Sequence, residues 1–133
     1  MNACVDDIHE FAGALRGAER TGADSGATVW SVRGKTFLFF RTPRPDALDP
    51  ETGERLTDVI VFWVRDLADK AALVNDDSTP FFTTPHFDGH PSVLLRAAHV
   101  AQVEREELRE VIEDACLARA PVRMAKQWLA ERG

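Results

Sequence analysis

Three side chains that can bind a divalent metal ion occur within five residues, in the stretch FFTTPHFDGHPSVLL over residues 81–95. Because side chains alternate along an extended strand, His86, Asp88 and His90 would share one side of such a strand. Imidazole and carboxylate groups together form a competent ligand set for zinc and other divalent ions. The spacing therefore raises the hypothesis of a metal site in this part of the chain.

The residues around these ligands favour a turn over a metal site. Asp88-Gly89 is a strong turn dipeptide, and Pro85 and Pro91 interrupt an extended strand on either side of it. A structural zinc site usually needs a fourth ligand, and the other histidines, His9 and His99, belong to other expected elements. We therefore expect a turn whose histidines cap or pack against neighbours, with no metal ion and no other cofactor bound.

The sequence motifs that would indicate catalysis do not occur. The serines lack the glycine context of a nucleophile elbow, Gly34-Lys35 lacks the preceding glycines of a phosphate-binding loop, and no His-Glu-x-x-His helix exists. The carboxylates between Glu104 and Asp114 alternate with arginines, which is typical of a solvent-exposed helix face. We therefore expect no catalytic residues and no enzyme activity.

The size and charge of the chain limit its function classes. With 133 residues and 44% hydrophobic content, it fits a single domain over residues 1–133. Sixteen Lys and Arg against 22 Asp and Glu give a net charge of −6, so the molecule as a whole repels polyanions and anionic membranes. Cys4 and Cys116 form no disulfide framework or Cys-x-x-Cys pair. Without a signal-peptide pattern or a run of about eighteen apolar residues, we expect a cytoplasmic protein that does not associate with membranes.

The first part of the chain predicts a helix and a β-hairpin. Apolar residues from Val5 to Leu15 recur at helical spacing, with Gly17 as the stop. After a Gly- and Ala-rich connection, ATVWSVRGKTFLFF indicates two strands joined by a tight turn at Arg33-Gly34. Residues 42–57 contain three prolines among charged residues and are expected to form an exposed loop.

The rest of the chain predicts more strands and helices. The expected elements are a strand over Val59–Val64, a helix capped by Asp66 and ending near Val74, extended segments over Phe81–Thr83 and Ser92–Leu95 around a turn at Pro85–Pro91, and helices over Glu104–Arg119 and from Pro121 onward. This order lacks the regular strand-helix alternation of a parallel sheet. We therefore predict an α+β fold, a two-layer sandwich of one antiparallel sheet and a helical layer, in the order α-β-β-β-α-β-β-α(α).

The strand TFLFF is apolar on both faces. Strict alternation would point Phe37 and Phe39 one way and Leu38 and Phe40 the other. Helices would cover one of these faces, and a loop, another helix or a partner would have to cover the second one. The strand therefore leaves room for a dimer or a ligand cleft.

A local excess of basic residues favours binding of a polyanion. From Leu117 to Gly133 only Glu131 is acidic, and the hairpin turn adds two more cations. The candidate nucleic-acid-binding residues are Arg33, Lys35, Arg119, Arg123, Lys126 and Arg132. Arg16 and Arg20 would extend this surface if the first helix lies alongside it. The alternative is that basic residues near helix ends serve the helix dipole.

Several motifs taken together resemble the MmcQ/YjbR-like family over nearly the whole chain. They are the hairpin VWSVRGKTFLFF, the strand VIVFWV followed by a short helix, the stretch FFTTPHFDGHPSVLLR, an acidic helix ending near ACLARAP, and the segment RMAKQWL. The most specific parts are Gly34-Lys35 and the turn Thr84-Pro85-His86-Phe87-Asp88-Gly89. The family turn often has an aromatic residue where this chain has His90.

The resemblance implies both a fold and a function class. The fold would be a helix, three strands, a helix, two strands and a helix, in a layout similar to that of type III secretion chaperones. Family members are described as DNA-binding proteins of unknown physiological role, on the basis of a double-wing surface, and the resemblance supplies no catalytic residues. The net charge of −6 is a departure from what a DNA-binding protein would be expected to carry.

Three hypotheses for function follow. The first is a small non-enzymatic protein of the MmcQ/YjbR type that binds DNA through its local basic surface. The second is a protein-interaction or chaperone-like module that binds a protein partner or a second copy of itself. The third is a small-molecule or metal-binding regulator built around the Pro85–Pro91 turn.

Overall fold

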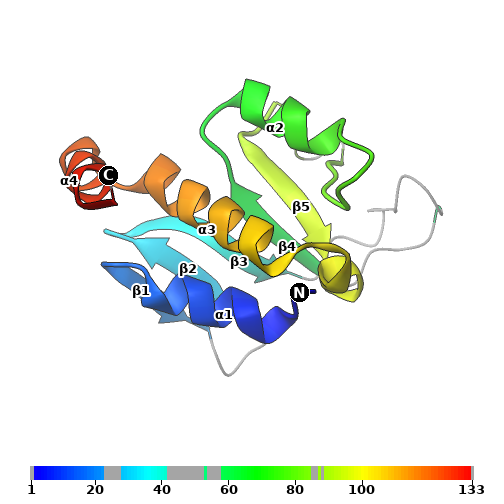
Figure 1. Ribbon diagram of the computed structural model, residues 1–133, viewed down its shortest axis with the longest axis horizontal. Coiled ribbons are helices and arrows are strands. Elements are labelled where there is room, and N and C mark those ends of the chain that lie inside the picture. The colour runs from blue at the N-terminus through cyan, green and yellow to red at the C-terminus, as the bar shows by residue number, and fades with distance from the viewer. Residues whose placement is uncertain are drawn as a thin grey trace.

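The computed structural model describes residues 2–22, 28–41, 53, 58–84, 87 and 89–132, which form an antiparallel sheet with helices packed on it (Figure 1). In chain order the elements are α1 (Val5–Ala14), β1 (Ala18–Thr21), β2 (Val29–Val32), β3 (Lys35–Arg41), β4 (Val59–Trp63), α2 (Leu67–Val74), β5 (Ser92–Arg96), the 3-10 helix η2 (Ala97–Gln102), α3 (Arg105–Arg119) and α4 (Val122–Arg132). The predicted α+β fold is confirmed, with the order α-β-β-β-β-α-β-α-α.

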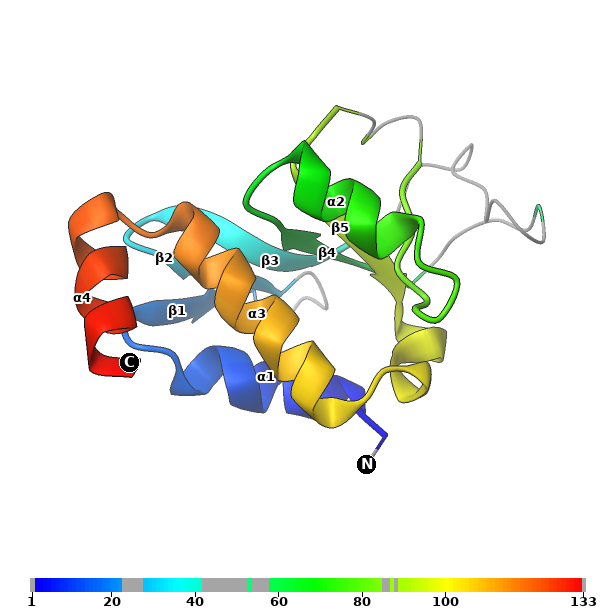
Figure 2. The same ribbon diagram turned by 45° about the horizontal axis from the view of Figure 1, so that its top comes forward.

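The sheet is a meander in which each strand pairs with the next one in sequence, in the order β1-β2-β3-β4-β5. All four pairings are antiparallel. Helices α1 and α3 lie side by side across one face, and α2 stands over β5 on the same side (Figures 1 and 2). Arg105 joins α3 to α1, because its Nε donates to Asp7 Oδ1 at 3.2 Å and its guanidinium lies 4.6 Å from the Phe11 ring.

Two elements differ from the expectation. Strand β1 was not predicted, because its sequence AERT is polar and mostly exposed and carries no apolar alternation. The Phe81–Thr83 segment was expected as a strand or extended segment, and there Phe82 forms an isolated bridge to Leu94. The 3-10 helix η2 was not predicted either. The loop expected over residues 42–57 lies outside the described residues except for Gly53.

The hairpin turn at Arg33-Gly34 is confirmed. Val32 pairs with Lys35, so only Arg33 and Gly34 form the loop. Both have positive φ, 51° and 81°, as a type I′ turn requires at its two central positions. The turn matches the right-handed twist of β2 and β3 and therefore holds the two strands in register.

A β-bulge in β3 overturns the expected alternation of its aromatic residues. Trp30 pairs with Leu38 but Ser31 pairs with Thr36, so Phe37 is the extra residue. As a result Phe37 and Leu38 both enter the main core under α1 and α3, and Phe39 joins a smaller cluster on the opposite face. Two-residue periodicity fails at a bulge because one residue is inserted without a partner.

The opposite face of the sheet is also packed. Val59, Val61 and Leu94 are buried there together with Phe87, which comes from the turn between α2 and β5. Phe39 and Phe82 are half-buried at its margin. The second apolar face predicted from the sequence is therefore covered in part by the chain's own turn.

Helix α4 is held at one end of the sheet through its inner face. Met124 and Trp128 pack on the main core. A Cβ on Gly17 would lie 2.8 Å from Met124 Cε, and Gly17 has a φ of +79°. The left-handed backbone just before β1 therefore favours glycine at this position, and the side chain of Met124 from α4 packs beside it.

His9 connects α1 to the sheet in its neutral form. Trp30 Nε1 donates to His9 Nδ1 at 3.2 Å, and the imidazole stacks on Phe40 with ring centroids 5.0 Å apart. Burial lowers the pKa of His9 and nearby Arg20 lowers it further, whereas Asp6 raises it. Protonation of Nδ1 would remove the acceptor for the indole N–H.

This bond predicts a pH-dependent stability. The unfolded chain takes up a proton at His9 near its ordinary pKa of 6.5, whereas the folded protein does so only at lower pH. The free energy of unfolding should therefore fall as the pH drops below 6.5, and His9→Asn, whose Oδ1 stays an acceptor without titrating, should reduce that fall. Urea unfolding at about pH 7.5 and about pH 5.5 measures both slopes. Identical slopes for wild type and variant would contradict the assignment.

Candidate functional site

The predicted basic residues converge at one end of the molecule. Arg33 is exposed on the β2–β3 turn and Lys35 at the start of β3, and Arg123 and Lys126 are exposed on α4. Both ribbon views place α4 beside the end of the sheet where β2 passes into β3 (Figures 1 and 2). We call the surface formed by Arg33, Lys35, Arg119, Arg123 and Lys126 the basic end.

Arg119 is the anchor of the basic end. Its Nε donates to the carbonyl oxygen of Thr36 at 3.0 Å, and its guanidinium lies 5.0 Å from the centroid of the Trp63 ring. These contacts tie the last turn of α3 to the first residues of β3, next to the hairpin turn. Arg119 is half-buried, so the four exposed cations of the basic end are better placed than Arg119 to meet a ligand.

Three other basic residues that the sequence singled out are Arg16, Arg20 and Arg132. Arg16 is exposed and directly precedes Gly17, which contacts α4. Arg20 lies further along β1, with its guanidinium 5.8 Å from the Trp30 ring. Arg132 is in the last turn of α4, but its side chain lies outside the described part of the structure. Arg16 lines a pocket together with Trp128 of α4 and with Arg109 and Glu113 of α3, and its part in the basic end stays a prediction.

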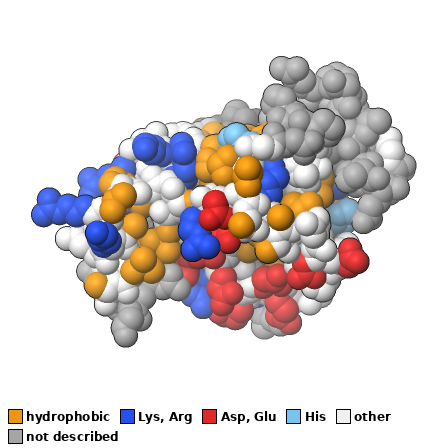
Figure 3. All heavy atoms as spheres, turned by 90° about the horizontal axis from the view of Figure 1, so that it is seen from above, with side chains coloured by type: hydrophobic (Ala, Val, Ile, Leu, Met, Phe, Trp, Pro, Cys, Tyr) orange, Lys and Arg blue, Asp and Glu red, His pale blue; other side chains and the backbone are white. Residues whose placement is uncertain are grey.

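Charge is segregated on the molecular surface. Figure 3 shows Lys and Arg side chains gathered at the end where α4 lies, with a separate group of Asp and Glu side chains away from it. The exposed carboxylates of α3 include Glu106, Glu110 and Asp114. The net charge of −6 is a sum over the whole chain, so it does not describe the local potential at the basic end.

Thr84, Phe87 and Gly89 are the described residues of the motif turn, which spans Thr84 to Gly89. Phe87 is buried against Val59, Val61 and Leu94, and its N–H donates to the Thr84 carbonyl at 2.9 Å. Pro85, His86 and Asp88 lie outside the described residues. Gly89 has a φ of +79°, which explains the glycine of the Asp-Gly turn dipeptide.

A buried lysine holds this turn from α2. Lys70 Nζ donates to the carbonyl oxygens of Phe87 at 2.5 Å and His90 at 2.8 Å. Sequence reasoning assigned Lys70 to a helix without giving it a role. Its spacing from Leu67 gave no signal of this burial, because Leu67 itself is 51% exposed, so the burial of Lys70 depends on the turn that packs against α2.

His90 is engaged within the fold. Its Nδ1 lies 2.8 Å from Ser92 Oγ, and its ring meets the Trp63 ring edge-on with centroids 5.1 Å apart. Within the described ranges no group of three His, Cys, Asp or Glu side chains is arranged to hold a metal ion. Because His86 and Asp88 lie outside those ranges, the absence of a metal site at the turn stays a prediction.

The chain matches a known protein family over most of its length. A family model described as YjbR matches residues 13–116, from the end of α1 into α3. The chain belongs to the YjbR family. The matched segment includes the hairpin turn, the motif turn and Lys70, whereas α4 with Arg123 and Lys126 follows it.

The curated relatives carry no assigned activity. Uncharacterized protein Mb2600 of Mycobacterium bovis and uncharacterized protein Rv2570 of Mycobacterium tuberculosis are each 41% identical over 139 residues, covering 98% of this chain and 99% of the relative. No solved structure matches the chain significantly. Among the described residues no helix is long and apolar enough to cross a membrane.

The lysine anchor predicts a measurable loss of stability in one variant. Lys70→Met removes two charge-assisted hydrogen bonds to the turn, so the free energy of unfolding should fall by about 2 kcal/mol. The matched control is Lys126→Met on the exposed face of α4, for which a change within about 0.5 kcal/mol is expected. Denaturant titration of both variants measures the difference, and equal effects would show that Lys70 does not hold the turn.

Proposed function

We propose that this YjbR-family protein is a non-enzymatic binding protein whose basic end contacts the phosphate backbone of DNA. One observation carries the proposal. Cations from the β2–β3 turn and from α4, about ninety residues apart in sequence, come together at one end of the molecule while the carboxylates of α3 lie elsewhere. A surface of this kind supplies the sequence-independent electrostatic part of DNA binding.

The composition of the basic end sets the expected strength of binding. Arg33, Lys35, Arg123 and Lys126 are long, exposed side chains on regular elements. If each of them neutralises one phosphate, the slope of log K against log salt concentration on duplex DNA should be about −3.6. So few contacts correspond to non-specific binding, with a dissociation constant on the order of 100 µM at physiological salt and a lower one at low salt.

The test is fluorescence anisotropy of labelled duplex and single-stranded DNA over a salt series from about 50 to 200 mM. The wild type should bind saturably and lose affinity steeply with salt. The variant Arg33→Asn/Lys35→Gln/Arg123→Gln/Lys126→Gln should lose most of the affinity and most of the salt dependence. Asn is preferred at the positive φ of position 33, and Gln is a good helix former, so the variant should keep the fold.

A single-charge control separates the basic end from a general charge effect. Arg65→Gln removes one exposed cation beside α2, and Lys126→Gln removes one from the basic end. Only Lys126→Gln should make the slope of log K against log salt concentration less steep, by about 1. No binding at the lowest salt, or equal affinity of wild type and quadruple variant, would refute the proposed surface.

A further inference from the structure

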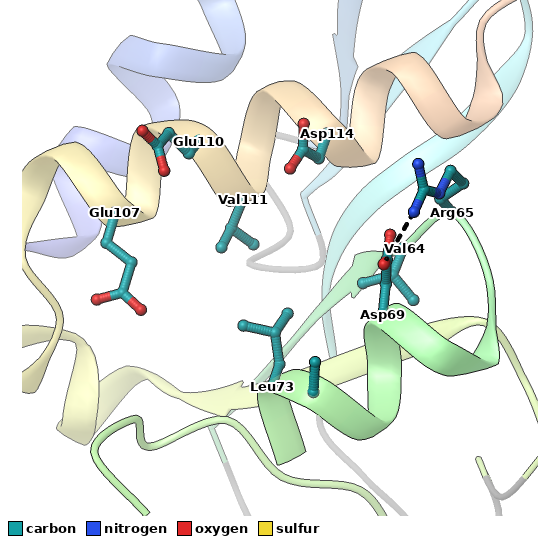
Figure 4. Close-up of a pocket in the computed structure, with 9 residues that line it drawn as sticks. Val64, Arg65, Asp69, Leu73, Glu107, Glu110, Val111 and Asp114 are labelled. Carbon is teal, nitrogen blue, oxygen red and sulfur yellow. Dashed lines mark hydrogen bonds and ion pairs between the residues drawn. The ribbon is translucent and has the colours of Figure 1, made fainter. Parts of the chain in front are cut away.

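A groove separates α2 from α3 on the helical side of the sheet. It has a volume of about 300 Å³. Val64, Leu73 and Val111 supply apolar surface within it, and Glu107, Glu110 and Asp114 line it from α3 (Figure 4). We call it the acidic groove.

The acidic groove is suited to a cationic, partly apolar occupant. Glu107, Glu110 and Asp114 follow one another at i, i+3 and i+7, so their carboxylates share one side of α3. The arginine that lines the groove, Arg65, is engaged by Asp69 at 3.2 Å from the α2 side (Figure 4). Glu107 and Glu110 lie further along α3 from Arg65 than Asp114 does, so they are the carboxylates that an incoming cation would meet (Figure 4).

The outer face of α4 has the complementary character. Val122 is 72% exposed and Leu129 is 52% exposed, whereas Met124 and Trp128 on the inner face pack on the core. Lys126 lies between Val122 and Leu129 on the same face, at i+4 and i+7 from position 122. Positions 122 to 129 span seven residues, about 10.5 Å of helix, the same length as Glu107 to Asp114 on α3.

We propose that a second copy of this chain places the outer face of its α4 in the acidic groove. Val122 and Leu129 meet the apolar floor, and Lys126 meets the carboxylates of Glu110 and its neighbours. This is recognition of a helix in a groove, with apolar anchors at i and i+7 and a charge between them. The contact joins two different surfaces, the outer face of α4 and the acidic groove. If each of two copies places its α4 in the groove of the other, a closed dimer forms; otherwise each copy binds a further copy and a chain of molecules grows.

The acidic groove takes no part in the proposed DNA binding. Helix α4, in contrast, belongs both to the proposed contact between copies and to the proposed DNA-binding surface. Lys126 belongs to both surfaces, so a copy whose α4 is docked has fewer cations for DNA. Glu110 and Leu129 belong to the contact alone, and Arg33 and Lys35 belong to the basic end alone. Variants at these two pairs of positions therefore distinguish failure of one proposal from failure of the other.

The test is sedimentation velocity of the full chain at low salt. The contact is small, so a dissociation constant on the order of 100 µM is expected, and the protein should be examined up to about 500 µM. Glu110→Lys and Lys126→Glu should each weaken association about tenfold, and the chain carrying both changes should regain it. Leu129→Ala should weaken association by a similar factor of about ten, because an apolar anchor is lost.

Two controls match these variants. Leu67→Ala truncates a leucine that is 51% exposed on α2 but does not line the groove, and Asp77→Lys reverses an exposed charge outside it. Both should associate like the wild type. Glu110→Lys and Leu129→Ala should retain the salt-dependent affinity for DNA in the anisotropy assay.

Three outcomes would overturn the proposal. A wild-type protein that stays monomeric at the highest concentration has no such contact. Association that Glu110→Lys leaves unchanged does not use the acidic groove. If Leu129→Ala weakens association but the chain carrying both Glu110→Lys and Lys126→Glu does not associate like the wild type, then α4 meets a different surface.

Discussion

The packing of α3 across the sheet is the interaction on which the rest of the structure depends. Leu108, Ile112, Ala115 and Cys116 are fully buried, and the helix contacts α1 and the strands β2, β3 and β4. Burial of a large aliphatic side chain contributes about 1.5 to 3 kcal/mol, so this face of α3 is a major part of the core energy. The C-terminal turn of α3 is tied to β3 by Arg119, just before α4 begins, and the outer side of α3 lines the acidic groove.

Both candidate binding surfaces follow from this placement. One side of α3 must be apolar to cover the sheet, and its remaining positions carry the carboxylates, which therefore stay away from the hairpin turn. Arg119 ties the end of α3 to the start of β3, so α4 begins near the hairpin turn, where Arg33 and Lys35 are exposed. The molecule is acidic along one helix and basic at one end, and its net charge hides this polarity.

The motif turn shows how the opposite face of the sheet is completed. The bulge at Phe37 leaves Phe39 as the aromatic residue of TFLFF on that face, and Phe87 fills the space above Val59 and Val61. Lys70 Nζ fixes the turn by donating to its carbonyl oxygens. A cation in this position is stabilised by the dipoles of the two backbone carbonyl groups that it contacts.

The sequence by itself determined the features that rest on local chemistry. Helical spacing predicts α1, α3 and α4, Arg33-Gly34 predicts the hairpin, and the element order predicts an α+β fold, because periodicity and turn preference act over a few residues. Tertiary structure alone decided β1, the bulge at Phe37, the burial of Lys70 and the convergence of the basic residues. Each of these depends on contacts between segments far apart in the chain, and a polar strand such as AERT forms only because β2 offers it a paired edge.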